Sequence, residues 1–161
     1  MRVQKGFTLV EILIVVVILG ILAAIVIPQF TNASTEAQTS ALCADLQTMR
    51  SQIELYKIQH IDALPPTTSF AAFEAAMTGY TLKDGTASTQ GTPGAVGPYM
   101  QKIPSNPFIS IEANKNQITF AGATVPSSGV EGWWMNATTG EFRANDTYDK
   151  DGVTGPDHAG L

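Results

Sequence analysis

An apolar run near the N-terminus constrains this chain of 161 residues more than any other feature. From Ile12 to Ile27 no side chain is polar, and the largely apolar stretch extends to Phe30. About 20 consecutive apolar residues suffice for a helix to cross the hydrocarbon core of a bilayer. Residues 7–30 are therefore predicted to form a single membrane-spanning helix.

Glu11 is the one charged side chain within this segment. A carboxylate at the centre of a membrane helix costs roughly 2.5 to 3.5 kcal/mol on insertion scales, so a lone one points to a function. The alternative is structural, because Glu11 lies close to the start of the segment and its side chain can reach the lipid headgroups. Both interpretations stay open at this point.

The residues before the apolar run form a short basic leader, Met1 to Gly6, which carries Arg2 and Lys5. This leader is too short for the first part of a secretory signal peptide, and no small-residue cleavage site follows the apolar run. The segment resembles the class III leader of type IV prepilins and pseudopilins. The resemblance rests on six features in order: the basic leader, Gly6, Phe7, Glu11, the apolar run and Pro28 at its end.

The resemblance implies that a membrane prepilin peptidase cleaves after Gly6 and methylates the new amino group of Phe7. It also implies that Glu11 pairs with the Phe7 amine of a neighbouring subunit and so sets the register of a filament. Gly20 and Pro28 are both poor helix formers, so the helix is predicted to be weakest between them, a region that filaments of the family often melt. The alternative is a mild kink without a role, since membrane helices tolerate both residues.

The chain is accordingly divided into a leader (1–6), a membrane and filament-core segment (7–30) and one globular domain (31–161). Its formal charge of −5 becomes −7 once the two basic residues of the leader are lost. An acidic exterior without clustered basic residues disfavours direct binding of nucleic acid.

The predicted fold class is α+β, because a long helix is followed by short alternating segments. The helix is expected to continue to about Ile61 and to end before Pro65, with a narrow apolar stripe that packs on the domain. The stripe consists of Leu42, Leu46, Met49, Ile53 and Tyr56. A coiled coil is the alternative, but the stripe covers barely two heptads and lacks patterned flanking charges. The resemblance implies the same arrangement, the pilin fold, with the long helix on a small antiparallel sheet.

A short helix is predicted to begin after Thr68 or Ser69 and to end at Gly79. Residues 84–97 are predicted to be an irregular loop that is mobile or contacts another subunit. Beyond this loop, alternating apolar residues predict a meander of about four antiparallel strands. The strand residues are Ile109 with Ile111, Ile118 with Phe120, Trp133 with Met135, and Phe142. Alternation also predicts that one ring of the pair Trp133 and Trp134 faces the core and that the other faces outward to contact another subunit; the alternative is a ligand platform made by both rings.

The segment from Gly97-Pro98-Tyr99 to Phe108 resembles the characteristic loop of major pseudopilins of type II secretion. This chain departs from the pattern at Met100, where leucine is usual, and at Asn106, where an acidic residue is usual. The alternative is a turn made rigid by proline with a packed tyrosine.

Single residues of interest give weaker signals. Cys43 is the only cysteine, which excludes an intrachain disulfide, and a small buried side chain on a helix face is favoured over a reactive thiol. His60 and His158 have no partners at catalytic spacing. Acidic residues crowd the C-terminal end, where the resemblance implies a calcium site; the alternative is a solvated acidic tail. The four candidate ligands are Asp146, Asp149, Asp151 and Asp157.

The sequence thus predicts a structural subunit of a type II secretion pseudopilus, anchored by one helix in the bacterial inner membrane with its C-terminal domain in the periplasm. The implied partners are further copies of the chain, the prepilin peptidase, the inner-membrane assembly platform and minor pseudopilins. The alternative within the family is the major subunit of a type IV pilus serving adhesion, twitching motility or DNA uptake. An enzyme or ligand-binding domain on a membrane anchor is disfavoured, because no nucleophile, base or metal constellation is recognisable.

Overall fold

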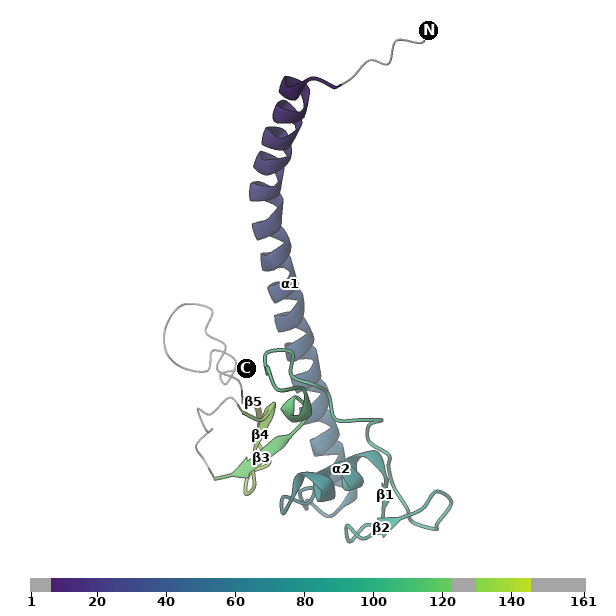
Figure 1. The fold of residues 1–161 in the computed structure, drawn as a ribbon. Coiled ribbons are helices and arrows are strands. Elements are labelled where there is room, and N and C mark those ends of the chain that lie inside the picture. Colours follow the sequence, from purple (N-terminus) through teal and green to yellow (C-terminus); the bar gives the residue numbers. More distant parts are fainter. Residues whose placement is uncertain (1–6, 123–129, 146–161) are drawn as a thin grey trace. The chain divides into compact units, whose positions relative to one another are not determined.

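A computed structural model describes residues 7–122 and 130–145 of the chain. The chain divides into two compact units, Met1–Thr39 and Ser40–Leu161. The elements in chain order are α1 (Leu9–Gln59), α2 (Phe70–Thr78), β1 (Tyr80–Thr81), β2 (Ala87–Ser88), the 3₁₀ helix η1 (Glu112–Asn114), β3 (Ile118–Ala121), β4 (Trp133–Asn136) and β5 (Phe142–Ala144). Figure 1 shows these elements along the chain. The predicted α+β class is confirmed.

Helix α1 is one continuous element of 51 residues with Pro28 inside it. The predicted stripe from Leu42 to Tyr56 is buried at all five positions and forms part of the core of the second unit. The helix ends at Gln59 and is followed by two residues of positive φ, Ile61 and Asp62, so it stops before it reaches Pro65. The position of the helix end is therefore predicted correctly to within a few residues, but the residues that terminate the helix are not.

Helix α2 follows the prediction closely. The Ser69 hydroxyl accepts a hydrogen bond from the Ala72 amide at 3.2 Å, as an N-cap residue does. At the other end the Gly79 amide donates to the Ala75 carbonyl at 3.0 Å. A Cβ on Gly79 would lie only 2.7 Å from that carbonyl oxygen, so the close approach requires glycine.

A mixed sheet of three strands, in the order β3-β4-β5, supplies the other side of the core. Strands β4 and β5 pair antiparallel, as predicted, whereas β3 and β4 pair parallel. The predicted antiparallel meander is therefore wrong at β3 and β4. Eleven residues, 122–132, separate the two strands, and part of this connection lies outside the described residues. Alternation in the sequence marks a strand but carries no information on the direction in which it pairs.

Two further strand predictions need correction. Ile109 and Ile111 do not lie in a strand, because the backbone around them makes local turn bonds: Ile109 donates to Asn106 and Ile111 accepts from Asn114, at the start of η1. Within the loop predicted to be irregular, β2 forms a strand and pairs antiparallel with β1, which lies just before the loop. Two-residue strands are too short to leave a period in the sequence.

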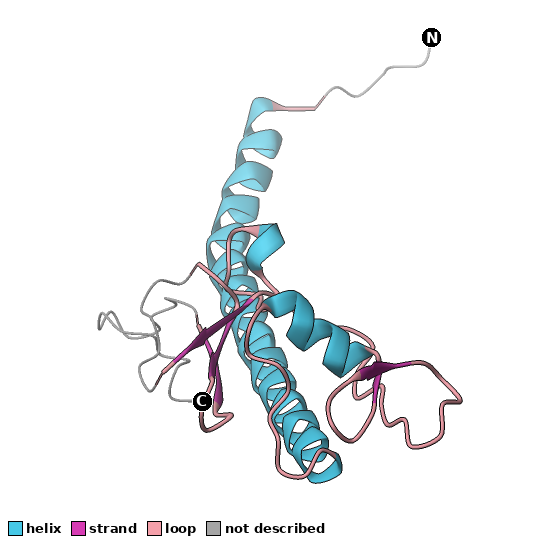
Figure 2. Cartoon of the chain, turned by 90° about the horizontal axis from the view of Figure 1, so that it is seen from below, coloured by secondary structure: helices cyan, strands magenta, loops and turns pink. Residues whose placement is uncertain are grey.

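The prediction for the adjacent tryptophans is half correct. Trp133 lies in the core, stacks on Phe142 at a ring-centroid distance of 5.5 Å and donates from Nε1 to the Pro104 carbonyl. Trp134 lies outside the core cluster, as alternation requires, yet it is also fully buried. The prediction that one of the two rings is exposed to another subunit is wrong in this structure, because alternation reveals which face a side chain takes and not whether that face is covered. Figure 2 shows the small sheet beside α1.

Candidate assembly segment

Helix α1 begins with a capping box made by Thr8 and Glu11. The Glu11 amide donates to the Thr8 hydroxyl at 3.2 Å, and the Glu11 carboxylate accepts from both the amide and the hydroxyl of Thr8 at 3.3 Å. These reciprocal bonds satisfy amide groups that a helix start otherwise leaves without a partner. Glu11 is thus held at the first turn by its own chain.

Sequence reasoning missed this role of Thr8. The signal was available, because Thr8-Leu9-Val10-Glu11 matches the pattern of a capping box immediately before an apolar run. The finding adds a third interpretation of Glu11, as a helix cap, beside register setting and contact with headgroups. The proposed pairing of Glu11 with the amine of a neighbour's Phe7 stays a prediction.

Every large apolar side chain between Leu9 and Phe30 is exposed in the isolated chain. The exposed fraction ranges from 44% at Val26 to 82% at Leu9. Among the described residues, α1 is the one helix long and apolar enough to cross a membrane, with a mean hydropathy of 3.3 in its most apolar window. Burying apolar surface of this kind is strongly favourable, so the segment requires lipid or other apolar helices around it.

Gly20 and Pro28 both lie inside α1. Gly20 has open space around it, since a Cβ there would meet no atom within 4 Å. Pro28 has no amide hydrogen and so cannot bond the carbonyl one turn earlier. After it, the hydroxyls of Thr31, Thr35 and Thr39 each donate to the carbonyl four residues before, at 3.0 to 3.2 Å. Such back-bonding slightly weakens a helix. Melting of this region on assembly stays a prediction.

The loop that resembles the pseudopilin signature is tied to the helices by specific bonds. The Tyr99 hydroxyl donates to the Gln59 side chain at 2.7 Å, and the amides of Tyr99 and Met100 donate to the Met77 carbonyl. Gly97 has a φ of +98° and a Cβ there would lie 2.6 Å from the Gly79 carbonyl oxygen, so only glycine fits. This loop is therefore part of the packed domain.

Asn106, which departs from the family pattern, is fully buried and organises the end of that loop. Its Nδ2 donates to the Gly132 carbonyl at 2.9 Å, and its Oδ1 accepts from the Phe108 amide at 2.9 Å. An aspartate would accept the second bond but has no donor for the first. The asparagine is thus matched to the carbonyl of Gly132, just before β4.

His60 is a structural histidine. Its Nδ1 lies 2.8 Å from the Tyr56 carbonyl oxygen, which can only accept, so Nδ1 carries the hydrogen and Nε2 accepts from the Thr81 hydroxyl at 2.9 Å. The ring stacks on Tyr56 at a centroid distance of 3.7 Å. Burial raises the pKa of Tyr56 and of Tyr99, which lies beside it. The cluster joins the end of α1 to β1 and to the Gly97 loop.

Only some of the remaining candidate residues belong to the described part of the chain. Gly6 and the four acidic candidates for calcium, with His158, fall outside the described residues. Within residues 7–122 and 130–145, no three His, Cys, Asp or Glu side chains come together to hold a metal ion. Cys43 is only half-buried, on the flank of α1 and not in its buried stripe, so the expectation of a buried side chain was too strong.

Comparison with known proteins finds similarity over the N-terminal segment and over most of the chain. Residues 1–27 match the family described as the prokaryotic N-terminal methylation motif. The chain is 36% identical over 159 residues to type IV major fimbrial protein FimA of Dichelobacter nodosus, covering 92% of this chain and 97% of that protein. It is 35% identical over 107 residues to type II secretion system core protein G of Pseudomonas aeruginosa, covering 66% of this chain and 70% of that protein. Core protein G of Vibrio cholerae is 32% identical over 108 residues, 67% of this chain and 68% of that protein. No solved structure matches.

Proposed function

The chain belongs to the type IV pilin and pseudopilin family, and from that premise we propose that it is the major subunit of a type II secretion pseudopilus. Proteins of this family are structural subunits that are anchored by an N-terminal helix and assemble into filaments. The secretion role is favoured by the loop from Gly97 to Phe108 and by the similarity to two proteins named type II secretion core protein G.

The observation that carries assembly is the exposed apolar surface of residues 9–30. A membrane covers this surface before assembly, and the same segments of other copies cover it in a filament. No catalytic step is needed for this function, because the free energy of assembly comes from burial of apolar surface and from contacts between subunits.

In the proposed sequence of events, the peptidase removes residues 1–6 and methylates the amine of Phe7. The domain that follows the membrane segment lies in the periplasm. Subunits are then lifted from the inner membrane by an assembly platform, in a filament begun by minor pseudopilins, and growth of the filament moves secreted proteins. When a subunit joins the filament, its Glu11 carboxylate accepts a hydrogen bond from the charged amine of a neighbour's Phe7. This charge-assisted bond forms only in one axial register between the two subunits.

A type IV pilus is the second candidate function, and one observation favours it. The similarity to the fimbrial protein of Dichelobacter nodosus covers nearly the full length of both chains, whereas the core proteins G are matched over about two thirds of their length. The two functions share leader cleavage and assembly and differ in where the filament ends.

The deciding experiment compares cells with and without the gene, by electron microscopy of the cell surface and by measurement of secreted proteins. A secretion pseudopilus predicts that secretion is lost while surface filaments are unchanged. The opposite result, loss of surface filaments with normal secretion, supports the pilus. If the native protein forms no filament and neither property changes, the filament proposal itself is wrong.

We further propose that the acidic C-terminal end binds calcium through Asp146, Asp149, Asp151 and Asp157. The described residue next to this end supports the idea: Asn145 is fully buried, and neither its Nδ2 nor its Oδ1, a suitable calcium ligand, has a hydrogen-bond partner among the described residues. At a free calcium concentration about 100 times Kd, binding stabilises a folded protein by roughly 2.7 kcal/mol.

The test melts the full chain in detergent with millimolar calcium and with chelator, in the wild type and in Asp149→Ala combined with Asp151→Ala. The wild type should melt at a higher temperature with calcium, and the double variant should lose that difference. Equal melting temperatures of the wild type in both solutions would show a solvated acidic tail.

A further inference from the structure

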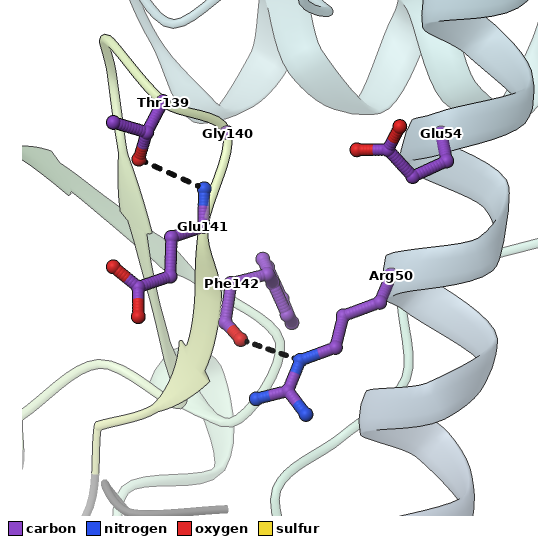
Figure 3. Close-up of a pocket in the computed structure, with 6 residues that line it drawn as sticks. All are labelled: Arg50, Glu54, Thr139, Gly140, Glu141 and Phe142. Atoms are coloured by element: carbon purple, nitrogen blue, oxygen red, sulfur yellow. Dashed lines mark hydrogen bonds between the residues drawn. The ribbon is translucent and has the colours of Figure 1, made fainter.

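Arg50 lies in an open groove beside α1 within the second unit. The groove encloses about 580 Å³ and is lined by Arg50 and Glu54 of the helix and by residues 139–142, which comprise the end of the turn after β4 and the first residue of β5. A smaller hollow with Cys43 and Gln47 continues from Arg50 along the same helix face. Figure 3 shows Arg50 reaching from the helix toward the Phe142 carbonyl.

The guanidinium group of Arg50 is fixed on one side and available on the other. Its Nε donates to the Phe142 carbonyl at 3.0 Å, and no carboxylate of the described residues lies within ion-pair distance of the guanidinium group. A guanidinium held through Nε keeps its two terminal nitrogens for a second group, and their spacing matches the two oxygens of a carboxylate.

The two acidic side chains in the groove already have basic partners. Glu54 accepts from Lys57 at 3.0 Å, and Glu141 accepts from Arg143 Nε at 2.8 Å. The positive charge of Arg50 is thus the one in this groove that no neighbouring carboxylate neutralises among the described residues. The groove therefore suits an anionic group from outside the chain.

Asp45, one and a half turns earlier on α1, is complementary to Arg50. It is half-buried, and neither a hydrogen bond nor an ion pair joins its carboxylate to any other described residue. Burial raises the pKa of Asp45, since nothing nearby compensates the charged form for the water it has lost. A cationic partner would therefore stabilise the charged form of this carboxylate.

The two residues cannot pair within one copy. Five residues of α-helix separate them by about 140° around the axis and about 7.5 Å along it, so the two side chains leave opposite flanks of the helix. Two complementary groups on different flanks of one chain give a head-to-tail contact between copies, and such a contact repeats into an open polymer.

We propose that Arg50 of one copy binds Asp45 of the next copy in the assembled filament. The occupant of the groove is therefore the flank of a second α1 helix. This inference rests on the proposed filament function and assigns it a contact in the globular unit, separate from the contact of Glu11. The pair is a specificity contact, because each charge left alone at a subunit interface opposes assembly.

The first test exchanges the charges in the full chain and measures the yield of purified filaments. Asp45→Lys and Arg50→Asp should each reduce the yield at least tenfold, and the double variant should recover most of it. Lys102→Glu, which changes an exposed lysine outside the groove, is the charge control and should leave the yield unchanged. Equal loss in the single and double variants would overturn the pairing.

Asp45→Asn guards against loss of folding. It removes the charge without a change in size and should raise the melting temperature of the detergent-solubilised chain above pH 3.8, because the ionised carboxylate is disfavoured in the folded state. The same variant should assemble poorly. A stabilised variant that assembles normally would remove Asp45 from the interface.

Crosslinking tests the contact directly in a chain whose own thiol is removed by Cys43→Ser. With both Asp45→Cys and Arg50→Cys in one chain, oxidised filaments should give a ladder of multimers, whereas either cysteine alone should give monomers. Dimers from Asp45→Cys alone would show a symmetric contact and contradict the proposal. Absence of filaments in the wild type would instead reject the filament function, and filaments without a ladder would reject only this contact.

Discussion

The two ends of helix α1 differ in what completes them. From Leu9 to Phe30 the helix is apolar on every side and its large side chains are exposed, so its environment must come from lipid or from other copies. From Leu42 to Tyr56 it carries a narrow apolar stripe, and that stripe is buried by its own domain. One secondary structure therefore serves two purposes, and the width of the apolar face distinguishes them.

The largest expected effect concerns the part that other molecules must complete. Glu11→Gln keeps a side chain that can serve in the capping box but removes the charge, whereas Thr8→Val removes the cap and keeps the charge. If Glu11 pairs with the amine of a neighbour, Glu11→Gln should lower filament yield at least tenfold, and Thr8→Val should have a smaller effect.

The yield of purified filaments and the amount of membrane-inserted subunit are both measured, with Thr8→Ser as the conservative control. Insertion should be normal in all variants, because none adds a polar group to the segment. Normal assembly of Glu11→Gln combined with failure of Thr8→Val would show that Glu11 acts as a helix cap, and the register hypothesis would then be dropped.

Gly6→Val addresses the step before assembly. A branched side chain beside the scissile bond should block a peptidase that binds the backbone closely, so the leader should remain attached. The intact mass of the membrane-extracted protein reports this. Normal cleavage of the variant, or a wild-type mass that still includes Met1 to Gly6, contradicts the class III leader.

Paired leucine truncations measure the difference between the two parts of the helix. Leu46→Ala deletes a fully buried side chain and should destabilise the domain by about 3 kcal/mol, the usual cost of a core leucine. Leu19→Ala, at an exposed position, should change the stability of the detergent-solubilised domain by less than about 0.5 kcal/mol. Denaturant unfolding followed by intrinsic tryptophan fluorescence, to which Trp133 contributes, gives both values. Similar losses in the two variants would mean that the membrane segment also packs on the domain.

The contrast also explains how far the sequence could be read. The buried stripe, the cap at Ser69 and the strand residues of β4 and β5 were predictable, because each depends on neighbours along the chain and leaves a period or a capping pattern. The leader and Glu11 were recognisable because their features come in a fixed order near the N-terminus.

What the sequence missed depends on contacts distant along the chain. Parallel pairing of β3 with β4 is set by where the connection returns, and the burial of Trp134 is set by what covers the second face of the sheet. The groove at Arg50 likewise requires Phe142, 92 positions away, to lie beside the helix. None of these leaves a local pattern, so only the folded chain reveals them.

Asn106→Asp tests how much the hydrogen bond between Asn106 and Gly132, which are distant along the chain, contributes to the stability of the domain. The variant replaces the donor to the Gly132 carbonyl by an oxygen and places a carboxylate in a fully buried site. A buried group left without its hydrogen bond costs about 1 to 3 kcal/mol, so a loss of about 2 kcal/mol is expected in denaturant unfolding. Asn106→Ala, which leaves the carbonyl without a partner but adds no charge, is the control. An unchanged stability of the aspartate variant would show that the site accepts the acidic residue usual in the family.

The smallest effect is expected at the end of α1, where the helix is closed by Ile61 at φ +56° and Asp62 at φ +62°. The Asp62 amide donates to the Lys57 carbonyl at 2.8 Å, the bond of a Schellman motif, in which glycine usually occupies the position that Ile61 has here. A left-handed conformation costs a branched residue roughly 1 to 2 kcal/mol, and glycine loses part of that gain through greater freedom in the unfolded chain.

Ile61→Gly should therefore stabilise the domain by about 0.5 to 1 kcal/mol, and since the Ile61 side chain is exposed, little packing is lost. Ile58→Gly, three positions earlier within the helix, should destabilise by about 1 kcal/mol and serves as the control. Thermal unfolding of both variants decides the point: destabilisation by Ile61→Gly would mean that the exposed isoleucine contributes contacts outweighing the strain of its backbone.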